Sequence, residues 1–173
     1  FLAGIVCPSG KLSETFPLCY GDTPVYGCYN DTCVVRYQEG LDVGYRYYDT
    51  YSVPVAFPFG HGMSYARFAY SDLHAECKGQ RIRLRFYVEN ISDTDGKEVV
   101  QVYVRPVQTF VYRPEKELKN YRKVFIGAGE KKEIELELTS GAFAYWSIAS
   151  DGWQVDDGLY EVLIGASSRE IYL

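Results

Sequence analysis

The sequence lacks a surplus of positive charge, and it lacks any long apolar run. Its 173 residues include 18 lysines and arginines against 23 aspartates and glutamates, and the formal net charge is −5. A phosphate backbone requires a basic stripe, which these mixed charges do not form, so we expect no nucleic-acid partner. No stretch approaches the roughly 18 apolar residues of a membrane-spanning helix, so we expect no membrane insertion.

Cysteine is present, but not in a pattern that defines a site. The five cysteines are odd in number and include no Cys-x-x-Cys pair, so they predict neither a complete disulfide framework nor a zinc site. Free thiols are the first expectation, one disulfide among Cys19, Cys28 and Cys33 is the second, and a metal site is the last. We predict no metal and no cofactor. Free thiols favour a cytoplasmic protein over a secreted one.

The apolar start of the chain, Phe1 to Val6, lacks the charged region and the cleavage site of a signal peptide. We therefore expect no secretion signal in this segment, and we expect the chain to begin within a longer protein.

No stretch shows a sustained helical period, whereas aromatic residues are abundant, with 17 tyrosines. Aromatic and β-branched residues favour strands, and several segments alternate apolar and polar residues. The predicted buried faces are Ile82, Leu84, Phe86 and Val88, then Val100, Val102 and Val104, then Ile134, Leu136 and Leu138. Six or seven such strands separated by turn residues predict an all-β fold, an immunoglobulin-like sandwich over residues 68–173.

Residues 1–67 have a different character. Prolines, glycines and tyrosines divide them into pieces too short to form a core of their own, so we expect an extended arm. In Tyr45-Arg46-Tyr47-Tyr48 the residue types alternate as the two faces of a strand do, which would place Tyr45 and Tyr47 on one face.

Several blocks of sequence, spaced in order, resemble the C-terminal part of glycoside hydrolase family 3 enzymes, which are β-glucosidase-like. The blocks are Pro8 to Pro17, Glu39 to Asp49, Phe57 to Tyr65, Lys97 to Val104, Arg113 to Lys119, Phe143 to Trp146 and Gly165 to Ile171. The resemblance implies that residues 1–67 are the tail of an α/β sandwich domain, with an edge strand near Lys11 to Phe16. It implies a fibronectin type III-like domain over residues 68–173.

The same resemblance implies that this chain holds no catalytic residue. In that retaining family the nucleophile is an aspartate of a barrel domain and the acid/base is a glutamate of the α/β domain, and neither segment matches this chain. We expect a non-catalytic region of a β-glycosidase that hydrolyses terminal β-linked glucose or related sugars, which stabilises the catalytic domains or shapes the rim of their site.

The expected partners are therefore the barrel and α/β domains, with carbohydrate reached only through them and a homodimer as a further option. The alternative is a stand-alone carbohydrate-binding or adhesive β-sandwich. The arm argues against that alternative, because a free module has no use for an orphan edge strand.

Weak candidates for substrate binding are Asp42, Tyr45 and Arg46, which share a block with the acids Glu39 and Asp49. The preferred interpretation is structural, with Arg46 pairing with a carboxylate in a buried polar joint between domains.

Two further features are open to a structural and to a functional interpretation. Trp146 and Trp153 could form a sugar-stacking platform, but an aromatic residue in a sandwich more often packs in the core or at a face between domains, which is the preferred interpretation. The charged run from Glu115 to Lys119 is expected to be a solvated strand or loop.

Overall fold

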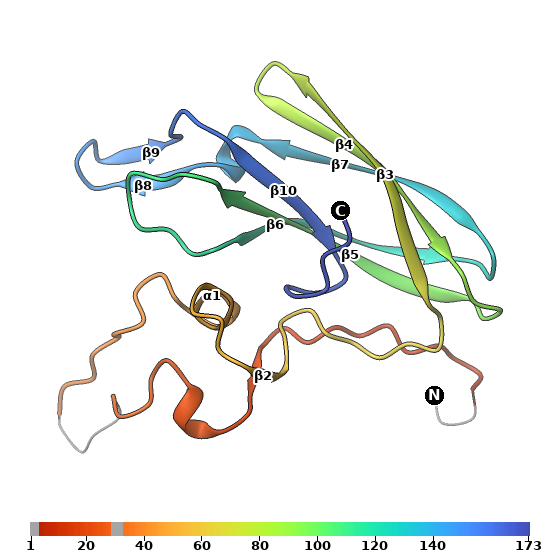
Figure 1. Ribbon diagram of the computed structural model, residues 1–173, viewed down its shortest axis with the longest axis horizontal. Coiled ribbons are helices and arrows are strands. Elements are labelled where there is room, and N and C mark those ends of the chain that lie inside the picture. The colour runs from red at the N-terminus through yellow and green to blue at the C-terminus, as the bar shows by residue number, and fades with distance from the viewer. Residues whose placement is uncertain (1–3, 29–32) are drawn as a thin grey trace.

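The computed structural model describes residues 4–28 and 33–173, and most of its strands belong to two three-stranded sheets that face each other (Figure 1). Every neighbouring pair of strands is antiparallel. The first sheet has the order β3 (Phe68–Lys78), β4 (Arg81–Asn90), β7 (Lys131–Thr139), and the second has the order β10 (Tyr160–Gly165), β5 (Gly96–Pro106), β6 (Glu117–Ile126). This is the predicted β-sandwich.

The core between the sheets follows the alternation read from the sequence. The buried side chains of the three predicted strands are Leu84, Phe86, Val88, Val100, Val102, Val104, Ile134, Leu136 and Leu138. Ile82 is half-buried and packs against this cluster. The predicted core is confirmed, because side chains two positions apart on a strand point to the same side of the sheet.

Residues before β3 run below the sandwich in Figure 1, and polar contacts join them to the β10-β5-β6 sheet and to the end of the chain, among other segments. This arm contains β1 (Phe16–Pro17), a 3-10 turn η1 (Tyr20–Asp22), the helix α1 (Tyr45–Thr50) and β2 (Val55–Phe57). We call residues 4–28 and 33–67 the arm from here on.

The edge strand predicted near Lys11 to Phe16 is wrong for most of its length. Only Phe16 and Pro17 form strand β1, and they pair with β2 of the arm itself. Leu12 instead makes two backbone hydrogen bonds with a nearby turn. Its N–H donates to the carbonyl of His61 and its carbonyl accepts from the N–H of Gly60, both at 2.8 Å. The turn at Gly60 has a φ of 81°, a glycine conformation that ends the pairing there.

The strand-like alternation expected at Tyr45 to Tyr48 is also wrong, because these residues form helix α1. Gly44 precedes the helix with a φ of 59°, a conformation that glycine adopts without strain, and it redirects the chain into the helical turn. Tyr45, Tyr48 and Asp49 are spaced i, i+3, i+4, so one face of the helix carries them together.

No helix among residues 4–28 and 33–173 is long and apolar enough to cross a membrane.

A small hairpin lies at one end of the sandwich (Figure 1). After the 3-10 turn η2 (Ser140–Ala142), strands β8 (Tyr145–Ser147) and β9 (Gly152–Gln154) pair so that Trp146 lies opposite Trp153.

Candidate functional site

The strongest cluster of charge lies where α1 meets the sandwich, at Asp49. Its side chain is 3% exposed, and it accepts a hydrogen bond from Arg169 Nε at 2.8 Å on Oδ1, while Lys116 Nζ lies 3.2 Å from Oδ2. Arg169 also donates to the backbone carbonyls of Tyr48 and Val53, at 3.0 and 2.8 Å. Two cations therefore compensate one buried carboxylate and fasten the end of the helix.

Arg46 pairs with a carboxylate, as the structural interpretation expected, but that carboxylate belongs to the sandwich. Arg46 lies 3.3 Å from Glu117, which also pairs with Arg113 at 3.0 Å and with Lys119 at 3.3 Å. Burial acts to raise the pKa of Glu117, but the hydrogen bond from Arg113 and the charges of Lys119 and Arg46 outweigh it and hold that pKa below its ordinary value.

The expectation of a solvated charged run is therefore wrong for its central residues. Lys116, Glu117 and Lys119 have largely buried side chains that form ion pairs, and their partners include Asp49 and Arg46 of the arm. The charged run is therefore part of the connection between the arm and the sandwich.

Tyr45 is packed rather than presented to a ligand. Its hydroxyl accepts a hydrogen bond from the N–H of Leu118 at 2.7 Å, its ring stacks on Phe59 with centroids 4.7 Å apart, and Tyr103 meets it edge-on at 6.0 Å. Burial raises the pKa of its hydroxyl. The contacts identify Tyr45 as an anchor of α1 on the sandwich.

Asp42 lies in a separate cluster. Its Oδ2 accepts hydrogen bonds from Tyr51 at 3.1 Å and from Tyr112 at 2.5 Å, and its carboxylate is buried. Asp42 thus has other polar partners than Tyr45 and Arg46, and the structure does not bring these three sequence candidates together as one polar site.

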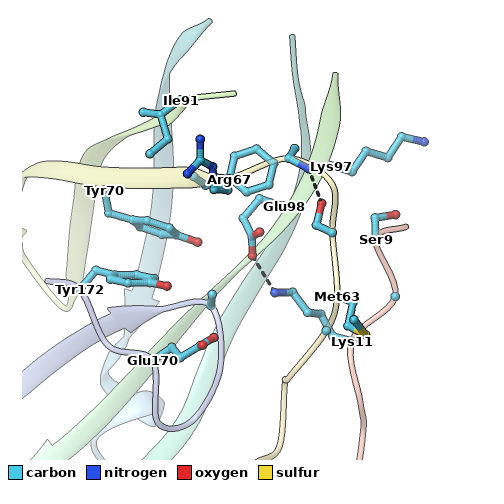
Figure 2. A pocket seen from close by; sticks show the side chains of 16 residues that line it. Ser9, Lys11, Met63, Arg67, Tyr70, Ile91, Lys97, Glu98, Glu170 and Tyr172 are labelled. Carbon is cyan, nitrogen blue, oxygen red and sulfur yellow. Dashed lines mark hydrogen bonds and ion pairs between the residues drawn. The ribbon is translucent and has the colours of Figure 1, made fainter. Parts of the chain in front are cut away.

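A second connection between arm and sandwich surrounds a cavity of 390 Å³ (Figure 2). Lys11 of the arm reaches into it and pairs with the buried Glu98 of β5 at 3.0 Å, as the dashed line in Figure 2 shows. Tyr70 and Tyr172 stack beside this pair with centroids 4.8 Å apart. Glu98 is paired with a lysine of the same chain. The ion pair at this cavity therefore fastens residues 9–11 to the sheet.

Sequence reasoning expected Lys116 to be solvated and gave no role to Arg169 or Glu98. Arg169 is 120 positions from Asp49 and Glu98 is 87 positions from Lys11, so no local pattern could pair them. The available signal was their position inside the blocks that carry the family resemblance.

Trp146 and Trp153 are surface residues, so packing in the core is wrong for them, whereas packing at a face between domains stays a prediction. Their side chains belong to residues that are 50% and 71% exposed. The rings meet edge to face, with centroids 5.7 Å apart and planes at 85°.

The described residues contain no group of three histidine, cysteine, aspartate or glutamate side chains arranged to hold a metal ion. All five cysteines are free thiols in the structure, including Cys19, Cys28 and Cys33.

Comparison with known proteins shows which proteins this architecture is similar to. Residues 98–168 match the fibronectin type III-like domain family. Over 99% of its length the chain is 46% identical to thermostable beta-glucosidase B of Acetivibrio thermocellus, and over 97% it is 44% identical to an exo-alpha-(1->6)-L-arabinopyranosidase of Bifidobacterium breve. The crystal structure of the Bifidobacterium adolescentis GH3 beta-glucosidase superposes on 100% of the chain with a TM-score of 0.95 and 44% identity.

The chain spans only part of each of these proteins. It covers 23% of the A. thermocellus protein, 22% of the B. breve protein and 26% of the B. adolescentis structure. The relatives therefore contain other domains beyond the region that is matched.

The joint at Asp49 generates a stability prediction. Replacing Asp49 with asparagine leaves Lys116 and Arg169 without their buried partner, so Asp49→Asn should lower the free energy of unfolding by about 3 kcal/mol in urea denaturation at neutral pH. The control is Glu76→Gln, which removes an exposed ion pair with Lys78 and should change stability by about 0.5 kcal/mol or less. Equal effects of the two substitutions would contradict the role assigned to Asp49.

Glu98 generates a prediction about pH. Burial raises its pKa and Lys11 only partly offsets this, so the folded protein holds the Glu98 proton more tightly than the unfolded chain does. This contribution to stability is fully present below the unfolded pKa of about 4.3, and it is lost as pH rises through the raised folded pKa. Glu98→Gln removes the titration.

Urea denaturation of both proteins from about pH 3.5 to about pH 7 tests this. The unfolding free energy of the wild type, taken relative to that of Glu98→Gln, should fall as pH rises above about 4 and then level off. A difference that is constant, or that grows with pH, would show that burial does not dominate at Glu98.

Proposed function

This chain is the fibronectin type III-like region of glycoside hydrolase family 3 β-glucosidases together with the arm that precedes it, and from this premise we propose that it is the non-catalytic C-terminal part of such an enzyme. In the intact enzyme it stabilises the catalytic domains or shapes the rim of their site. The hydrolysis of terminal β-linked glucose or a related sugar is then carried out by the other domains.

The observation that carries this proposal is the full coverage of the structural match. The superposition at a TM-score of 0.95 includes the arm as well as the sandwich, so the arm has the course that the same segment has within a much larger β-glucosidase. A free sandwich module would be matched over its strands alone.

The outer surface of the arm supports the same conclusion. Its exposed large apolar residues include Ile5, Leu18, Tyr37, Leu41 and Val43, and Tyr37 is 90% exposed. The pair β1 and β2 forms a two-stranded sheet, and such a small sheet is marginal without a neighbour. Exposed apolar groups and short sheets of this kind are typical of surfaces that another domain covers.

The sugar is not set by this region. Relatives named as a β-glucosidase and as an arabinopyranosidase match it at 46% and 44% identity, so closely similar regions accompany different activities. A stand-alone carbohydrate-binding module, the alternative function, would leave the exposed apolar residues and the β1-β2 pair of the arm uncovered.

A chimera tests the proposal. The matched region of the B. adolescentis enzyme is replaced by this chain, and Tyr37→Ser with Val43→Ser is introduced into the chimera and into the free chain. In the free chain both side chains are exposed, so the double substitution should change the unfolding free energy by about 0.5 kcal/mol or less. In the chimera each covered side chain should cost about 1.5 to 3 kcal/mol, measured as a lower melting temperature.

Activity provides the second readout. The chimera should hydrolyse 4-nitrophenyl β-D-glucoside, whereas the free chain should not, because a glycosidase needs two carboxyl groups at the scissile bond and their segments lie in the other domains. An inactive chimera, or equal effects of the double substitution in both settings, would count against the proposal. Turnover by the free chain that Asp42→Asn abolishes would place a catalytic site in the arm.

A further inference from the structure

A groove of 690 Å³ lies between the β8 and β9 hairpin, the loop at residues 111–114 and the start of α1. Its aromatic lining residues are Tyr112, Tyr145, Trp146 and Trp153. The volume is that of a small-molecule site, since such sites occupy about 300 to 1,000 Å³. The groove is distinct from the cavity in Figure 2, and Leu41, one of the exposed apolar residues of the arm, also lines it.

The floor of this groove is positively charged in a chain whose net charge is −5. Arg46, Arg113 and Lys119 line it and converge on Glu117, at 3.3, 3.0 and 3.3 Å. Among the described residues that line the groove, Glu117 is the only acid, so three positive charges face one negative charge. The lining therefore carries two more positive charges than negative ones, while the carboxylates of Asp42 and Asp156, which are not lining residues, accept hydrogen bonds from the lining residues Tyr112 and Tyr145.

Two of the three cations can reach an occupant. The side chain of Arg113 is 3% exposed and donates to the carbonyl of Phe143 as well as to Glu117, so it holds the floor in place. The side chains of Arg46 and Lys119 are 35% and 17% exposed. An arginine has five N–H donors and a lysine has three, so each can bind a second carboxylate without releasing Glu117.

The tryptophan pair forms the opposite wall. The two ring planes are nearly perpendicular, so the edge of one ring meets a face of the other. Because the two residues are 50% and 71% exposed, the remaining ring faces are accessible to an occupant. An indole ring has a broad apolar face and a polar N–H, which suits ligands that are apolar on one side and polar at the edge. The hydrogen-bearing face of a pyranose ring has this character.

We propose that the groove binds an acidic saccharide. The apolar face of a pyranose lies on Trp146 or Trp153, and the carboxylate of a uronic acid unit accepts hydrogen bonds from Lys119 and Arg46. The chemistry that selects this ligand is the combination of aromatic rings with an excess of two positive charges in one small groove. An acidic segment of a protein is the less favoured occupant, because the groove has the volume of a small-molecule site.

Intrinsic fluorescence tests the proposal directly, because Trp146 and Trp153 are the only two tryptophans of the chain. The chain is titrated at low salt with methyl β-D-glucuronide and, in parallel, with methyl β-D-glucoside, which differs by lacking the carboxylate. We expect a saturable change with the glucuronide and at least about tenfold weaker binding of the glucoside. Binding of the glucuronide should weaken as salt is added, because the charges are partly exposed.

Charge variants locate the site. Lys119→Gln should weaken glucuronide binding by about tenfold or more, whereas Lys132→Gln should leave it unchanged. Lys132 of β7 is the matched control because its partly exposed ammonium pairs with Glu130 and lies outside the groove lining. If Lys119→Gln fails to fold, as judged by circular dichroism, Arg46→Gln takes its place.

Three outcomes would overturn the proposal. One is equal binding of the two glycosides, another is no saturable change with either, and the third is glucuronide binding that the groove variants leave intact. A fluorescence change produced by a tetraglutamate peptide but not by the glucuronide would also overturn it, in favour of a protein partner.

Discussion

The buried carboxylate of Asp49 determines how the arm sits on the sandwich. A six-residue helix has little stability in water, because nucleation costs more than so few hydrogen bonds return. Lys116 and Arg169 come from the loop before β6 and from the turn after β10, so the ion pairs join three distant segments at one point. Without these pairs nothing local would keep α1 folded, and Tyr45 and Tyr48 would lose the positions that pack them.

A second pair, Lys11 with Glu98, fastens the arm near the opposite end of the same sheet. Buried charges contribute little net stability, since desolvation offsets most of the attraction, but an alternative position that leaves one of them unpaired is costly. Two such pairs specify where the arm lies rather than how stable it is. The outward side of the arm, with its exposed apolar residues, is therefore held in one shape before any other domain meets it.

The sandwich could be predicted from sequence because period-two alternation is a local signal. Leu84, Phe86 and Val88 are two positions apart, and each is fully buried. Helix α1 was missed because Tyr45 to Tyr48 is short and aromatic, and such residues favour strands, although Gly44 and the spacing of Tyr45, Tyr48 and Asp49 were consistent with a helical turn. The candidate site was harder still, because the partners of each charge are far apart in sequence and only the fold brings them together.

Hydrogen exchange of the free chain tests the central claim that the arm and the sandwich form one unit. The amide of Tyr51, which bonds to the carbonyl of Tyr47 at the end of α1, should be protected nearly as well as the amides of β5. The amide of Tyr26, in an exposed turn of the arm, provides the fast reference. In Asp49→Asn, protection at Tyr51 should fall while that of Val102 in the core changes far less. If Tyr51 exchanges as fast as Tyr26 in the wild type, the helix is not held by the sandwich and the account is wrong.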